Sequence, residues 1–242
     1  PSREDSVNLT DGGIGTWLRR LVAQRARTAR EGVRVAAAAI DSLGYISSGR
    51  SYVICDRQEG WVLSVVKGRH WVARRVPDDE VMVLANCYTI GEMDLADTAN
   101  VLASPDLIDY ATERGWYDPA SDDAFDFARV YGDPQSLTAP VNTHRMWRGI
   151  NLMARDSVDM DGPFPFSFTP DTLITQTRLM NVLRDHYEGT PLDRSQGYTR
   201  GSPHQANEHT LCADINQCGF VAQLRPDLPA ALSLLWWAPR RP

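Results

Sequence analysis

The apolar residues between positions 28 and 43 recur every three or four residues, which is the spacing of one face of a helix. Thr28 and Glu31 stand where an N-terminal capping box needs a hydroxyl and a carboxylate, and Gly44 is a typical helix stop. The sequence therefore predicts a helix over 28–43. Its buried stripe would consist of Ala29, Val33, Ala36, Ile40 and Leu43.

Four short apolar runs follow, separated by turn residues such as Lys67-Gly68. The second run is apolar at almost every position, which indicates a strand covered on both faces. The turns between the last three runs are too short for parallel crossovers, so we expect these runs to be consecutive antiparallel neighbours in one sheet. The predicted strands are Tyr52–Asp56, Trp61–Val66, His70–Val76 and Val81–Ala85.

After residue 90 the apolar spacing becomes helical, and near the end it returns to that of strands. This order of elements indicates a single α+β, layered domain over residues 1–242, with residues 1–24 as a flexible or irregular lead-in. The predicted helices are Pro105–Gly115, Phe125–Tyr131, Thr143–Ala154 and Pro170–Glu188. The predicted late strands are His209–Ile215, Phe220–Leu224 and Leu232–Ala238.

Composition and charge exclude several classes of function. The net charge of −6, without a Lys/Arg cluster, argues against a nucleic-acid partner. No stretch approaches the roughly 20 apolar residues that cross a bilayer, and Pro1–Asp5 shows no signal peptide. No CxxC pair occurs, so we interpret the cysteines as buried reduced thiols, which favours a cytoplasmic location. These cysteines are Cys55, Cys87, Cys212 and Cys218.

A metal site is not expected from the histidines. Zinc proteases place two histidines four residues apart on a helix. His204 and His209 are five residues apart around Glu208, and the segment before His209 is predicted to be a loop. His70 and His144, like His186, stand alone in the sequence, which favours structural or surface roles.

Asn86 is the candidate catalytic residue. It ends the apolar run 81–85, and an amide at the end of a buried strand must form a hydrogen bond. It could be a turn residue that closes the strand, or its N–H groups could stabilise a developing oxyanion. The residues alone favour the turn.

Several separated motifs resemble, in order, those of C69 dipeptidases, the peptidase family to which the secernins are related. The first is Trp71-x-Ala73-x-Arg75-x-Pro77-Asp78-Asp79, followed by Ala85-Asn86. The later ones are Asp94-x-x-Asp97-x-x-Asn100, Gly115-Trp116-Tyr117-Asp118-Pro119, Phe125-Asp126-Phe127, His209–Asp214, Val221–Arg225 and Leu235–Pro242. The resemblance extends from about Arg25 to the end of the chain.

The resemblance implies an N-terminal-nucleophile (Ntn) hydrolase with a four-layer αββα sandwich. It implies hydrolysis of dipeptide substrates by a cysteine at the mature N-terminus, whose α-amino group acts as base, with no metal or organic cofactor. It also assigns Asn86 to the oxyanion site. The chain begins with Pro1, so we expect residues 1–242 to lack the nucleophile segment and to be inactive alone.

The chain departs from the resembled family at two positions, and other functions stay open. Ser64 replaces an acidic residue found in many relatives, and Arg69 replaces a frequent histidine. Both changes would alter contacts to the substrate. The alternatives are a non-catalytic interaction protein like the secernins and an Ntn amidase or acylase acting on a non-peptide amide. An exposed sheet edge left by missing strands would favour homo-oligomers.

Overall fold

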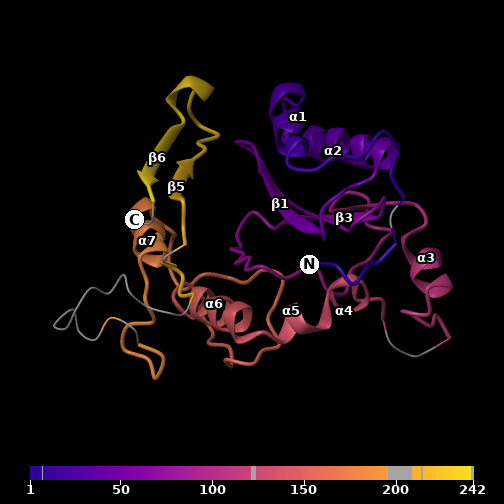
Figure 1. Cartoon of the computed structure of the whole chain (residues 1–242). Coiled ribbons are helices and arrows are strands. Elements are labelled where there is room, and N and C mark those ends of the chain that lie inside the picture. The colour runs from indigo at the N-terminus through magenta and orange to yellow at the C-terminus, as the bar shows by residue number, and fades with distance from the viewer. Residues whose placement is uncertain (7, 121–123, 194, 196–208, 214, 241–242) are drawn as a thin grey trace. The chain divides into compact units, whose positions relative to one another are not determined.

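The computed structural model describes residues 1–242 except 7, 121–123, 194, 196–208, 214 and 241–242. The chain falls into two compact units: unit 1 comprises Pro1–Asp79 and Asn86–Thr138, and unit 2 comprises Glu80–Ala85 and Ala139–Pro242. Figure 1 shows helices combined with antiparallel strands, which confirms the α+β class. The single domain expected from the sequence stays a prediction.

Unit 1 is built on a four-stranded antiparallel sheet with the order β1-β2-β3-β4. The strands are β1 (Arg50–Cys55), β2 (Gly60–Val65), β3 (Trp71–Val76) and β4 (Val101–Ala103). β1 pairs with β2 and β2 with β3 through short turns, as the sequence predicts. Every residue from Trp61 to Val66 is fully buried, which confirms that this strand is covered on both faces.

The prediction that Val81–Ala85 is the next strand of this sheet is wrong. Only Val81 pairs, in an isolated bridge with Phe168, and the run belongs to unit 2. β4 lies beside β3 in its place, in the register Arg74↔Val101 to Val72↔Ala103. A short apolar run indicates that a segment is buried, but it does not identify the strand with which the segment pairs. All five residues of this run are half-buried.

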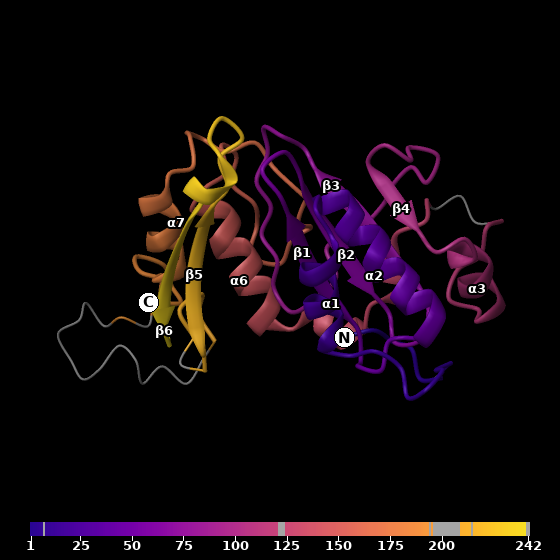
Figure 2. The same ribbon diagram turned by 90° about the horizontal axis from the view of Figure 1, so that it is seen from above.

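Two helices, α1 (Trp17–Arg25) and α2 (Ala29–Leu43), cover one face of the sheet (Figures 1 and 2). The Thr28 cap is confirmed, since its hydroxyl accepts from the Glu31 amide at 3.1 Å. The Glu31 carboxylate accepts from the Arg27 amide at 2.7 Å, not from the Thr28 amide, so the reciprocal bond of a full capping box is displaced by one residue. α2 ends at Gly44, whose φ of 77° suits glycine. The irregular lead-in expected over 1–24 is wrong for its last part, because burial of Leu18 stabilises α1.

The rest of unit 1 consists of short helices and an aromatic cluster. Two of these helices, α3 (Leu107–Glu113) and α4 (Phe127–Tyr131), are shorter than the segments predicted from the sequence. A third helix, α5 (Pro134–Thr138), was not predicted. Tyr88 joins this layer to the sheet, since its hydroxyl donates to the Val65 carbonyl at 2.7 Å and its ring packs 5.1 Å from that of Phe127.

Unit 2 contains α6 (Pro140–Asn151), α7 (Gln176–Leu183), the 3₁₀ turn η3 (Ala230–Leu232) and an antiparallel hairpin of β5 (Cys218–Gln223) and β6 (Leu234–Pro239). The long helix predicted over Pro170–Glu188 is wrong at both ends. Thr175 accepts from the Arg178 amide at 3.2 Å and starts α7 late, and Leu173 is 85% exposed. The described part of His209–Ile215 contains no strand.

No helix in the described parts of the chain combines the length and the apolar character that a membrane crossing requires.

Candidate functional site

Two of the sequence motifs come together at one cavity of unit 1. The cavity, of about 510 Å³, lies where β3 ends and the segment before β4 returns to the sheet. Its lining consists of Arg74, Arg75, Pro77, Asp78, Asp79, Met93, Asp94, Asp97, Asn100 and Val101. We call it the signature cavity, since most of these residues belong to the motifs that begin at Trp71 and at Asp94.

The backbone explains why these motifs meet. The Arg75 amide donates to the Asn100 carbonyl at 2.8 Å, which extends the β3–β4 ladder by one bond. Asp97 holds the preceding turn, because its carboxylate accepts from the Asn100 side chain at 2.9 Å and its carbonyl accepts from the Val101 amide at 2.8 Å. Asp94 caps the same turn by accepting from the Ala96 amide at 2.8 Å. The Asp/Asn spacing therefore serves local turn formation.

Arg75 fixes the other wall of the signature cavity. Its Nε lies 3.2 Å from the Glu59 carboxylate, and its Nη2 lies 2.5 Å from Asp78. Arg74 donates to the Glu92 carbonyl at 3.3 Å. The sequence indicated that Arg75 and Asp78 belong to one motif, but Glu59 comes from the β1–β2 turn and could not be assigned from sequence spacing.

The lining chemistry favours binding over covalent catalysis. Asp79 and Asp94 are exposed carboxylates at the cavity and can accept a cationic group such as a protonated amine. No cysteine, serine, threonine or histidine is present among the described residues that line the cavity. The signature cavity therefore offers recognition but no side-chain nucleophile of the usual kinds.

Asn86 lies elsewhere and in a different setting from the one predicted. It is exposed and sits in a bend, so it does not close a buried strand, and it is not part of the lining of the signature cavity. Tyr88, two residues later, is anchored under the sheet by its bond to Val65. Burial raises the pKa of Tyr88, so the hydroxyl stays protonated and keeps donating. This anchor holds the bend that presents Asn86. The catalytic role of Asn86 stays a prediction.

The two departures from the resembled family have structural roles here. Ser64 is fully buried in β2, and its hydroxyl lies 3.0 Å from that of Ser51 on β1. Arg69 donates to the Asp41 carbonyl and, at 2.7 Å, to the Thr10 hydroxyl, which ties the N-terminal segment to the end of α2. Neither side chain lines the signature cavity.

None of the four cysteines forms a disulfide, and only Cys212 is buried. Cys55 and Cys218 are exposed, because each lies on an edge strand, so the prediction of buried thiols is wrong for them. No group of three or more potential metal ligands occurs among the described residues. His204 and Glu208 lie outside the described residues.

His70 has the structural setting that its sequence context favours. Its ring stacks on Tyr110 with centroids 4.0 Å apart, and its Nε2 lies 3.3 Å from the Asp106 carboxylate. Tyr110 in turn donates to Glu4 at 2.7 Å. These contacts fasten the N-terminal segment to α3.

Comparison with known proteins finds similarity to peptidases along most of the chain. The model of peptidase family C69 matches residues 7–239. A probable dipeptidase of Salmonella dublin is 31% identical over 210 residues, which cover 86% of this chain and 47% of that protein. A dipeptidase of Bifidobacterium longum is 28% identical, with coverage of 98% and 47%, and dipeptidase A of Lactobacillus helveticus is 25% identical, with coverage of 96% and 48%.

The chain therefore spans about half the length of the curated relatives it matches. The match to the family covers both units, including the signature cavity and Asn86. On this evidence the chain belongs to peptidase family C69.

Proposed function

We propose that this chain forms part of a hydrolase that cleaves the peptide bond of dipeptides. The observation that carries the proposal is the family match over residues 7–239, together with three relatives that bear the name dipeptidase.

The proposed chemistry is that of an N-terminal cysteine. Its thiolate would attack the carbonyl carbon of the dipeptide, after the α-amino group takes the thiol proton. The same proton would pass to the leaving amine as the peptide bond breaks, and water would then hydrolyse the thioester. The four cysteines of these 242 residues are internal and have no free α-amino group, so this proposal takes the nucleophile from outside them.

We further propose that the Asn86 side chain donates to the oxyanion of the tetrahedral intermediate. Its exposure leaves the amide accessible to a substrate, and the bond from Tyr88 to Val65 holds its bend against the sheet. Loss of one such preorganised donor costs about 10²–10³ in kcat. The αββα sandwich that the resemblance implies is part of the same proposal.

The test uses the full-length gene product with dipeptides that carry free termini. Asn86→Ala should lower kcat by about 10²–10³ with little change in Tm, because the side chain is exposed. Asn8→Ala is the matched control, since Asn8 is also exposed and lies in the N-terminal segment. Wild-type kinetics in folded Asn86→Ala would remove Asn86 from the site, and full-length protein without activity on any dipeptide would overturn the proposed function.

A cytoplasmic location belongs to this proposal as well. It is supported by the four cysteine thiols, none of which is in a disulfide and two of which are exposed. Alkylation counting on protein taken from cells, with and without prior reduction, would test it, and a disulfide formed before reduction would contradict it.

A further inference from the structure

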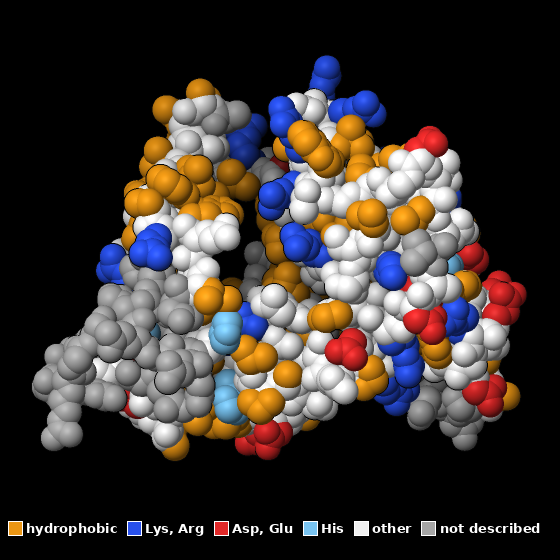
Figure 3. All heavy atoms as spheres, in the orientation of Figure 1, with side chains coloured by type: hydrophobic (Ala, Val, Ile, Leu, Met, Phe, Trp, Pro, Cys, Tyr) orange, Lys and Arg blue, Asp and Glu red, His pale blue; other side chains and the backbone are white. Residues whose placement is uncertain are grey.

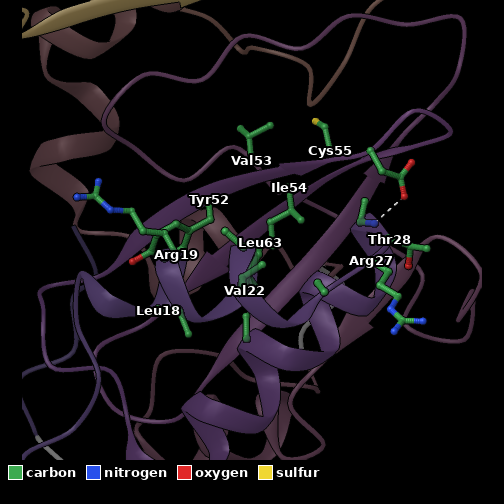
Figure 4. Close-up of a pocket in the computed structure, with 15 residues that line it drawn as sticks. Leu18, Arg19, Val22, Arg27, Thr28, Tyr52, Val53, Ile54, Cys55 and Leu63 are labelled. Atoms are coloured by element: carbon green, nitrogen blue, oxygen red, sulfur yellow. Dashed lines mark hydrogen bonds between the residues drawn. The ribbon is translucent and has the colours of Figure 1, made fainter. Parts of the chain in front are cut away.

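A second cavity of unit 1 lies on the helical side of the sheet, at its β1 edge. It has a volume of about 290 Å³ and runs between α1, the start of α2 and strand β1 (Figure 4). We call it the α1–β1 groove. It is distinct from the signature cavity, which lies beside β3 and β4, at the opposite edge of the same sheet.

The floor of the groove is apolar and deep. Leu18 and Leu63 are fully buried, and Val22 with Ile54 forms the walls. Figure 4 shows Tyr52 and Ile54 pointing from β1 toward the helices, and Val53 and Cys55 pointing away. The groove stays open because its helical wall is built from small side chains, namely Ala23, Ala26, Ala29 and Ala36.

The rim of the groove is cationic. Arg19 and Arg27 lie at its two ends, and neither forms an ion pair with a carboxylate among the described residues (Figure 4). The segment 17–50 carries seven arginines and only two carboxylates in a chain of net charge −6. The arginines are spread along that segment, so they do not form a run in the sequence, but Figure 3 shows basic side chains gathered over α1 and α2.

The one carboxylate of the lining does not oppose this charge. Asp56 accepts backbone N–H groups of Ala29 at 2.6 Å, Gln58 at 2.6 Å and Glu59 at 3.0 Å, so it caps α2 and the β1–β2 turn. Its charge is therefore compensated by three oriented amides.

A hydroxyl donor completes the Arg19 end. The Tyr52 and Tyr45 hydroxyls lie 2.9 Å apart, so when Tyr45 donates to Tyr52, the Tyr52 proton is available to a ligand. Burial raises the pKa of Tyr52, which keeps this hydroxyl protonated, while the nearby Arg19 charge acts in the opposite direction. Arg19 and Tyr52 together form a carboxylate-binding pair beside an apolar floor.

We propose that the α1–β1 groove binds small amphipathic carboxylates, with the carboxylate on Arg19 and Tyr52 and an aliphatic chain over Leu18, Val22, Ile54 and Leu63. A cavity of about 290 Å³ suits a medium-length chain. The proposal rests on the groove alone and is independent of dipeptide hydrolysis.

The test measures decanoate binding to the full-length protein by calorimetry below the micellar concentration. Arg19→Gln should weaken binding by about tenfold, the worth of one charge-assisted hydrogen bond. Arg20→Gln is the matched control, because Arg20 stacks on Trp17 at 5.1 Å and does not line the groove. Ala23→Trp should abolish binding by filling the groove, whereas Gln24→Trp, its exposed neighbour, should not.

Three results would overturn the proposal. The first is the absence of decanoate binding at millimolar concentration, which is expected if another segment or a second copy covers the groove. The second is equal binding of decyltrimethylammonium, which shares the chain but not the charge. The third is an equal loss of affinity in Arg19→Gln and Arg20→Gln, which would indicate general attraction of anions to the basic surface.

Discussion

The four-stranded sheet of unit 1 and the β5–β6 hairpin of unit 2 are built from similarly apolar strands but lie in opposite environments. In β2, Trp61, Leu63 and Val65 are fully buried. In the hairpin, Phe220 is 60% exposed and Trp237, its cross-strand partner, is 62% exposed. Apolar sequence alone therefore does not decide which strand is an interior one.

The difference comes from what each sheet packs against. α2 presents a fully buried stripe that includes Val33, Ala36 and Ile40 to the unit 1 sheet. The hairpin contacts α7, a helix with no buried residue. Only one face of the hairpin is covered in part, through Val221 and Trp236.

The other face of the hairpin is an apolar surface, visible in Figure 3 over β5 and β6. Its cross-strand pairs are Cys218–Pro239, Phe220–Trp237 and Ala222–Leu235. A two-stranded hairpin is marginal in water, and an exposed apolar face of this kind typically marks an interaction surface. The comparison thus separates a completed core from a surface that lacks a partner in the described chain.

The largest expected effect is at the centre of the completed core. Trp61→Ala should lower the free energy of unfolding by about 3–5 kcal/mol, because it removes a fully buried ring and leaves a cavity. It also removes the surface over which the Arg30 guanidinium lies, 4.9 Å from the ring centroid. Urea unfolding followed by circular dichroism measures the loss. A loss below about 1 kcal/mol would contradict the close packing of this sheet.

Two elements of this core, α2 and β2, could be predicted from the sequence. Thr28, Glu31 and Gly44 define a helix through local hydrogen bonds and backbone geometry, and the structure forms those bonds. The continuous apolar run from Trp61 to Val66 likewise indicated burial on two faces, since a strand with one wet face alternates. The helix needed only neighbouring residues, whereas the burial of β2 also depended on what covers it, because the equally apolar strand β6 is largely exposed.

The failures in the unit 1 sheet and its cavities concern partners that are distant in sequence. The run Val81–Ala85 is apolar enough for a strand, but β4 takes the place beside β3 because the Asp97–Asn100 turn delivers Val101 there. The signature cavity was visible only as motifs, since its closure depends on the register of β3 with β4 and on Glu59. The α1–β1 groove was missed entirely, because cavities depend on packing between elements.

The second prediction concerns the buried ion pair between Arg148 and Asp185, which we expect to stabilise unit 2 as Trp61 stabilises unit 1. Arg148 makes two bonds to Asp185 with Nε, at 2.9 and 3.0 Å, and one with Nη2 at 2.5 Å, and the Asp185 side chain is only 7% exposed. Arg148→Leu should cost about 3 kcal/mol, because it leaves a buried carboxylate unpaired. Adding Asp185→Asn should recover part of the loss. A double variant that is less stable than the single one would contradict this account.

The third prediction concerns the edge of the unit 1 sheet and its dependence on pH. Burial acts to raise the pKa of Asp56, but the amides of Ala29, Gln58 and Glu59 lower it below its ordinary value. A lowered folded-state pKa stabilises the protein above the unfolded value, about 3.9, and the stabilisation is lost as pH falls through the folded value.

Asp56→Asn should therefore cost about 1–2 kcal/mol at pH 7, since a charge-assisted cap becomes a neutral one. The difference from wild type should shrink as pH falls below about 4 and vanish at lower pH. Unfolding curves at pH 7, 4 and 3 for both proteins measure it. A difference that is constant with pH would show that the carboxylate charge does not contribute.

The smallest expected effect is at the hairpin, where Trp237→Ala is the counterpart of Trp61→Ala. Trp237 is 62% exposed, so its removal from an uncovered face should change the free energy of unfolding by no more than about 0.5 kcal/mol. Cross-strand contact with Phe220 adds only a few tenths of a kcal/mol more.

Both variants are compared at several protein concentrations, with light scattering to record the mass of the species. If a second copy covers this face, wild type should associate and Trp237→Ala should shift toward monomer, with a loss of stability that grows with concentration. A loss near that of Trp61→Ala in a strictly monomeric protein would show instead that the hairpin face is buried within the chain in solution, and the contrast between the two sheets would not hold.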